Sequence, residues 1–128
     1  MRAQEIFDTV ATHLFTQGRR AITIDEQCAY KTNDGLKCAV GCLIPDDMYS
    51  SKMENTDVVT LLAFQSDYGY TIPKYFARNQ DMLSQLQTIH DDEYSWLSTE
   101  DMKDALKKVA RNHHLKMSVL NNLSFEDR

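Results

Sequence analysis

Three cysteines and one histidine carry most of the chemistry that this sequence could perform. The cysteines are Cys28, Cys38 and Cys42, and His90 lies in a later amphipathic segment. Thiolate and imidazole groups are the usual ligands of structural zinc, so these four residues could hold a zinc ion and stabilise an interaction module. The cysteine spacing of nine residues and then three matches no standard zinc module. We expect no metal and no other cofactor, because free cysteines usually act as small core residues.

The same residues raise the alternative of a thiol-dependent enzyme. Cys38 or Cys42 would be the nucleophile, His90 the general base, and Asp91 the group that orients the histidine. Cys38 begins a short apolar run, and a thiol at a helix N-terminus can have a lowered pKa. The sequence contains no Walker loop, GxGxxG or GxSxG motif that would indicate other chemistry. A non-catalytic role is favoured over an enzyme, and both stay open.

Two polar rims beside packed segments are the best candidates for a binding site. Loops held by a rigid scaffold commonly carry contacts, and aromatic residues anchor interfaces. One rim follows Pro45, and the other ends the acidic segment that carries the histidine. The candidate binding residues are Asp46, Asp47, Tyr49, His90, Asp91, Asp92 and Trp96. Each of these residues could instead have a structural role, as a cap, as the partner of a buried group or as a part of the core.

Composition indicates a soluble globular protein. The 128 residues fit one domain, with 42% hydrophobic and 26% charged residues. A net charge of −5 argues against nucleic acid, whose binding depends on lysine and arginine. No apolar run approaches the length of a membrane span, and the first residues lack a signal-peptide core. The odd number of cysteines is unusual for a secreted disulfide domain, so we expect a cytoplasmic protein with free thiols.

Hydrophobic periodicity predicts the elements that must position these residues. Apolar residues recur at three- and four-residue spacing in four segments, which we expect to be helices: 3–17, 57–65, 79–93 and 99–112. Residues 28–38 carry Thr-Asn-Asp-Gly at their centre, which is typical of a hairpin turn. We therefore expect a mostly helical α+β fold, with about four helices around a small β-hairpin, in a single domain of residues 1–128. Residues 117–128 are expected to form a loosely packed tail or to add to a homodimer face.

The cysteine-rich stretch also carries a resemblance. It reads Cys-x-Tyr and then Gly-x-Lys-Cys-Ala-Val-Gly-Cys-Leu-Ile-Pro-Asp-Asp, ending at Asp47. This motif is similar to that of a family of small proteins encoded mainly by tailed bacteriophages and by some bacteria. Leu86-Gln87-x-Ile89-His90-Asp91, followed by Trp96 and a last helix, is similar to the second half of the same family, so the resemblance covers about Glu5 to Leu115.

The resemblance implies a source and gives no mechanism, because no activity is established for the family. Together with the residues above, it favours a phage-type accessory protein in the host cytoplasm. Such a protein would bind a host protein or a small ligand and would perform no chemistry of its own.

Overall fold

The structure, a computed structural model, describes residues 1–125 and shows helices without a sheet. Six α-helices and four short 3-10 helices follow one another in this part of the chain. Its isolated β-bridges are two antiparallel pairs, Ile22 with Cys28 and Lys31 with Lys37. The expected α+β fold with a β-hairpin is therefore wrong, and the described chain is mostly helical.

The chain does reverse where the hairpin was expected, but the backbone pairing beside the turn is limited to the bridge of Lys31 with Lys37. The Thr32 N–H donates to the carbonyl of Leu36, and the Leu36 N–H donates to Oγ1 of Thr32. Before the turn, the N–H groups of Tyr30 and Lys31 donate to the carboxylate of Glu54, at 2.8 and 3.1 Å. Since these donors are bound to a side chain from another segment, they cannot extend a pair of strands.

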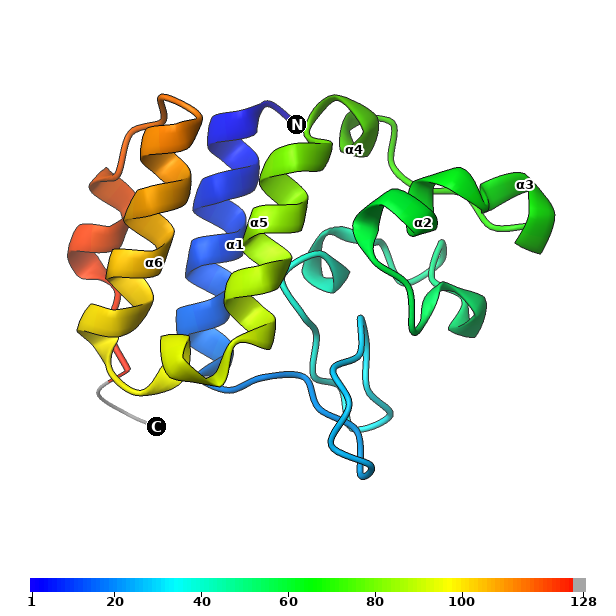
Figure 1. Cartoon of the computed structure of the whole chain (residues 1–128), viewed down its shortest axis with the longest axis horizontal. Helices are drawn as coiled ribbons and strands as arrows, with labels where there is room; N and C mark the ends of the chain where they lie inside the picture. The colour runs from blue at the N-terminus through cyan, green and yellow to red at the C-terminus, as the bar shows by residue number, and fades with distance from the viewer. Residues whose placement is uncertain (126–128) are drawn as a thin grey trace.

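Three long helices form a bundle. They are α1 (Ala3–Gln17), α5 (Gln80–Asp91) and α6 (Thr99–Asn112), and they stand side by side in Figure 1. Each buries one apolar stripe, and the fully buried residues include Ile6, Phe7, Val10, Leu14, Leu83, Leu86, Met102 and Leu106. Helix α1 has the bounds that were predicted, and the N–H of Asp101 donates to Ser98 at the start of α6. The helices predicted from periodicity in these three segments are confirmed.

The other three α-helices are short and lie on the far side of α5 from α6 (Figure 1). They are α2 (Val58–Ala63), α3 (Gln65–Tyr68) and α4 (Tyr75–Arg78). The single helix predicted over 57–65 is thus shorter and is followed by a separate turn. We call residues 19–78 the irregular lobe, because in its first part, up to residue 57, the described helices are two 3-10 turns of three residues each.

The cysteine-rich stretch packs inside the irregular lobe around a close backbone contact. Its apolar run, which begins at Cys38, contains a 3-10 turn at Gly41–Leu43. A Cβ atom placed on Gly41 would lie 1.9 Å from the carbonyl oxygen of Tyr30. Only glycine allows two backbone segments to approach this closely.

The C-terminal segment packs on the bundle as far as the structure describes it. Leu120 and Phe125 are buried, and the Phe125 ring lies 5.7 Å from that of Trp96 and 4.5 Å from that of Phe15. Within the expected tail of residues 117–128, Leu120 and Phe125 thus pack on the bundle, and residues 126–128 lie outside the described part. None of the helices in residues 1–125 has the length and apolar content that crossing a membrane requires.

Candidate functional site

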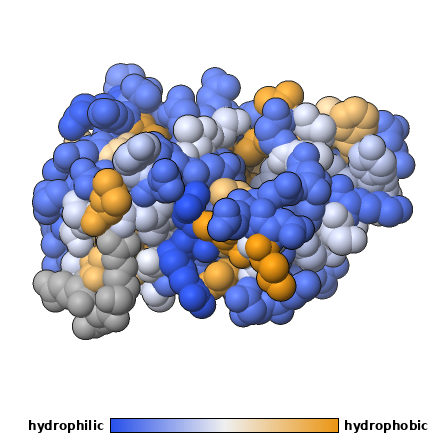
Figure 2. All heavy atoms as spheres, turned by 60° about the horizontal axis from the view of Figure 1, so that its bottom comes forward, coloured by the Kyte–Doolittle hydropathy of each residue, from blue (hydrophilic) through white to orange (hydrophobic). Residues whose placement is uncertain are grey.

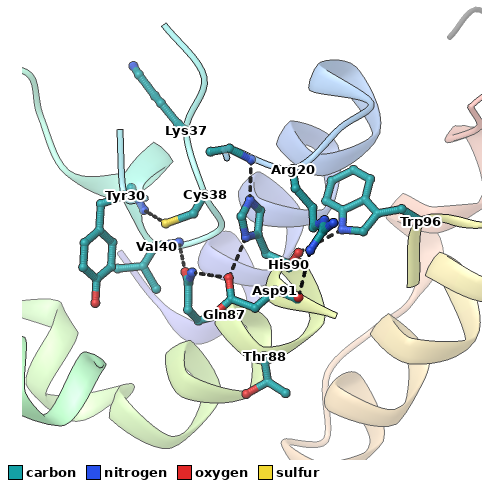
Figure 3. Close-up of polar contacts among 12 residues, drawn as sticks. Arg20, Tyr30, Lys37, Cys38, Val40, Gln87, Thr88, His90, Asp91 and Trp96 are labelled. Atoms are coloured by element: carbon teal, nitrogen blue, oxygen red, sulfur yellow. Dashed lines mark hydrogen bonds and ion pairs between the residues drawn. The ribbon is translucent and has the colours of Figure 1, made fainter. Parts of the chain in front are cut away.

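The buried His90 is the centre of a partly exposed hydrogen-bond network at the C-terminal end of α5 (Figure 3). Its side chain is completely buried, and its Nε2 lies 2.9 Å from the backbone nitrogen of Ala21. Because that backbone N–H can only donate, Nε2 must be the unprotonated acceptor. The proton of the neutral ring is then on Nδ1, which donates to Oδ1 of Asp91 at 2.8 Å.

Oδ1 of Asp91 accepts a second hydrogen bond, from Gln87. Nε2 of Gln87 donates to Oδ1 of Asp91 at 3.0 Å, and Oε1 of Gln87 accepts the N–H of Val40 at 3.1 Å. Figure 3 shows this chain of contacts from the cysteine-rich stretch through Gln87 and Asp91 to His90. The network therefore ties α5 to two segments of the irregular lobe, the one at Ala21 and the one at Val40.

Trp96 closes the network from the bundle side. Its Nε1 donates to the carbonyl of His90 at 2.9 Å, and the two rings meet edge to face with centroids 5.9 Å apart. Trp96 is 8% exposed and His90 is 0% exposed. The structure thus places these two candidate binding residues in the interior, where a partner cannot touch them.

The network brings together one group of possible metal ligands. Among the described residues, Cys28, His90 and Asp91 have ligand atoms within 4.8 Å of one another, and neither Cys38 nor Cys42 belongs to that group. A metal-bound imidazole normally donates its other N–H to an acceptor. Here the other nitrogen faces the N–H of Ala21, so metal at Nδ1 would set two donors against each other. These residues do not fit a zinc ion.

The thiols are poor nucleophiles. Burial raises the pKa of Cys28 to about 11, and the nearby Asp91 carboxylate adds to the effect. Burial raises the pKa of Cys42 to about 12, and it raises the pKa of the completely buried Cys38 as well. Since the thiolate is the reactive form, a raised pKa keeps these groups mostly protonated near neutral pH. His90 cannot deprotonate them through Nε2, which is already an acceptor.

The rim after Pro45 is a small cluster of charges. Nζ of Lys31 lies 2.6 Å from Oδ1 of Asp46 and 5.4 Å from the centroid of the Tyr49 ring, and Nζ of Lys37 lies 3.6 Å from the same aspartate. The hydrogen bond from Lys31 and the charges of both lysines hold the pKa of Asp46 below its usual value. Asp47 is exposed beside it.

The remaining candidate residues have local partners. The Tyr49 hydroxyl donates to Oε2 of Glu54 at 2.5 Å. Asp92 accepts the N–H of Tyr94 at 3.0 Å and so caps the 3-10 turn that follows α5. Among the seven candidate binding residues, Asp91 is the one that lines the cleft described next.

A cleft of about 390 Å³ separates α5 from the irregular lobe. Its α5 wall is a polar stripe at helical spacing, and the other walls come from residues 28–30 and 54–59. The α5 stripe consists of Ser84, Gln87, Thr88 and Asp91. A volume of this size is in the range of small-molecule sites, which is roughly 300 to 1,000 Å³. A neighbouring groove of about 600 Å³ shares the edge formed by residues 28–29 and 54–55.

Sequence reasoning missed most of this cleft. The polar residues Ser84 and Thr88 look like an ordinary solvated helix face, and Asp57 was expected in the first turn of a helix, where the structure makes it the N-cap of α2. The available signal was the polar stripe opposite the apolar face of α5, but such a stripe does not reveal what faces it.

Comparison with protein-family models, with curated proteins and with solved structures found no match to this chain. The resemblance to phage proteins therefore stays a prediction. The functional argument rests on the geometry of the network and of the cleft.

Proposed function

We propose that this protein is a phage-type accessory protein of the host cytoplasm that acts by non-catalytic binding of a host protein or a small ligand. One observation carries the proposal, namely that both ring nitrogens of His90 are engaged in internal hydrogen bonds. A general base or a metal ligand needs a free nitrogen. The network therefore supports a structural role for the histidine and leaves the cleft as the place where another molecule could bind.

The cleft is suited to binding because its polar wall is held in place. The stripe lies on α5, a regular helix of the bundle, and two internal donors fix the Asp91 carboxylate. Side chains that are already ordered lose little entropy when a ligand arrives. A small molecule, or one side chain of a host protein, would bind against this wall.

The proposal is tested by blocking the cleft. Thr88 is exposed, lies on α5 and lines the cleft, so Thr88→Arg fills it without touching the core. Thr12→Arg is the matched control, because Thr12 is also an exposed threonine within a long helix and lies outside the cleft. Tagged versions of the parent and both variants are used to capture partners from phage-infected bacterial extract, and bound proteins and small molecules are identified by mass spectrometry.

We expect the parent and Thr12→Arg to capture the same partner, and Thr88→Arg to lose it while melting at the same temperature. Capture of that partner by Thr88→Arg would show that the cleft is not the binding site. Turnover of a substrate by the pure protein, lost in a folded His90→Phe variant, would replace the binding function with an enzyme.

A further inference from the structure

We propose that the cleft between α5 and residues 54–59 binds an alkylammonium group, that is, a primary amine on a short apolar chain. The inference rests on the proposed binding function and adds the chemical class of the ligand. Three properties of the cleft carry it: the charge of its lining, the hydrogen-bonding roles that its side chains leave open, and an apolar edge beside the polar wall.

All the charged side chains among the described residues that line the cleft are acidic. Three carboxylates line it, those of Glu54, Asp57 and Asp91, and no lysine or arginine is among the described residues that do so. Concave walls of low dielectric strengthen the attraction between such a lining and a cation. An anionic ligand would be repelled by the same walls.

Three side chains of the lining offer acceptors, those of Thr88, Asp57 and Asp91. The Thr88 hydroxyl donates to the carbonyl of Ser84 at 3.0 Å, so its hydrogen is engaged and its oxygen can still accept a hydrogen bond. Oδ1 of Asp57 accepts the N–H of Thr60 at 2.7 Å, and this bond orients the carboxylate without covering it, since Asp57 is exposed. The Asp91 side chain keeps 44% of its surface exposed although Oδ1 accepts two donors. An ammonium group offers three donors and no acceptor, and so complements this wall.

The apolar edge suits a chain of methylene groups. Ala29, Val58 and Val59 line the cleft together with the carboxylates, and Val59 is 54% exposed. A ligand that covers Val59 removes apolar surface from water while its amine reaches the acceptors. On the face of the molecule in view in Figure 2, hydrophilic residues cover most of the surface and hydrophobic ones form only small groups.

The probe for this inference is n-butylammonium chloride. It is titrated into ¹⁵N-labelled parent protein while the backbone amide signals of Asn55, Ser84 and Thr88 are followed by NMR. Butan-1-ol has the same chain without the charge, and sodium butyrate has the opposite charge. We expect saturable shifts of the cleft amides with the amine and none with the alcohol or the carboxylate.

A pair of variants measures the contribution of charge. Asp57→Asn keeps a good helix-capping side chain and removes one negative charge from the cleft. Asp67→Asn makes the same change on α3, where Asp67 is exposed and does not line the cleft. We expect Asp57→Asn to weaken butylammonium binding about two- to fivefold, the range for one partly exposed ion pair. Asp67→Asn is expected to leave the affinity unchanged.

Two further probes distinguish the source of the amine. Tighter binding of 1,4-diaminobutane than of butylammonium would indicate a free polyamine. Tighter binding of Nα-acetyl-lysine amide would indicate a lysine side chain of a partner protein. Either result supports the ammonium assignment.

Equal shifts with butan-1-ol, or equal affinities of the two aspartate variants, would overturn that assignment and leave the proposed binding function in place. The absence of any saturable shift with butylammonium would also overturn the ammonium assignment. If Thr88→Arg still abolishes partner capture, the proposed binding function would remain in place. Conversely, saturable amine binding together with partner capture by Thr88→Arg would support the amine site and refute the proposed function.

Discussion

The helical bundle and the irregular lobe are stabilised in different ways. In the bundle, α1, α5 and α6 bury long apolar stripes, so each side chain supplies a small part of a large contact. In the irregular lobe, a few specific contacts fix the backbone, such as the carboxylate of Glu54 on two consecutive N–H groups. The comparison implies that single substitutions should be most damaging where one atom or one side chain fixes the lobe.

The largest effect is expected from Gly41→Ala. The new methyl group would lie 1.9 Å from the Tyr30 carbonyl oxygen, and both sides of this contact are backbone that cannot simply rotate away. Overpacking of a well-packed interior usually costs about 1 to 3 kcal/mol, and we expect a loss of about 3 kcal/mol here. Urea unfolding followed by circular dichroism measures it.

Gly35→Ala is the matched control, because nothing lies within 4 Å of its added Cβ. Its φ of +91° still strains an alanine, so we expect a loss of about 1 kcal/mol. Equal losses for the two variants would show that the close contact at Gly41 does not hold the lobe.

The next largest effect is expected from His90→Phe, which acts where the bundle meets the lobe. The phenylalanine ring has a similar shape but cannot accept the N–H of Ala21, which is buried. A buried donor without a partner costs about 1 to 3 kcal/mol, and we expect a loss of about 2 kcal/mol in urea unfolding. A variant as stable as the parent would mean that the network does not stabilise the fold, and the structural role of the histidine would have to be abandoned.

The smallest effect is expected in the pH dependence of the free energy of unfolding, to which His13 contributes. This half-buried side chain on α1 donates from Nε2 to the carbonyl of Lys37 at 2.8 Å and so joins the bundle to the lobe. Burial lowers the pKa of His13 from its ordinary value of 6.5, the bond to the Lys37 carbonyl opposes this, and the charge of Lys37 lowers it further.

The lowered pKa of His13 determines the direction in which stability changes with pH. The unfolded chain binds the proton more readily, so the stability from neutral His13 is complete above the unfolded pKa and is lost as the pH falls through it towards the lower folded value. Urea unfolding at about pH 7.5 and about pH 5.5 should show a smaller loss in His13→Gln than in the parent. An identical loss in both proteins would assign the pH dependence to other groups.

Local patterns were sufficient to predict the bundle. The bounds of α1 follow from an apolar stripe that ends before Gly18, and the start of α6 follows from Ser98 as a cap. The buried stripe of α5, including His90, was also predicted. These signals lie within a few residues of the structures that they specify, which is why sequence alone identifies them.

The hairpin and the cleft depend on residues that are distant in the sequence. The turn at Thr32 was recognised, but the strands beside it were not formed, because Glu54 engages the N–H groups of Tyr30 and Lys31 from another segment. The cleft likewise combines residues 28–30, 54–59 and 84–91. No local pattern shows that these three stretches meet.

The most direct test of the structural role of His90 is the protonation of its ring. Long-range ¹⁵N–¹H NMR distinguishes the two neutral tautomers, and the account predicts a proton on Nδ1, bound to Asp91, with Nε2 accepting the N–H of Ala21. One equivalent of zinc should leave these signals unchanged. A proton on Nε2, or a shift of the ring nitrogens with zinc, would contradict the account, because His90 would then be available for metal binding or catalysis.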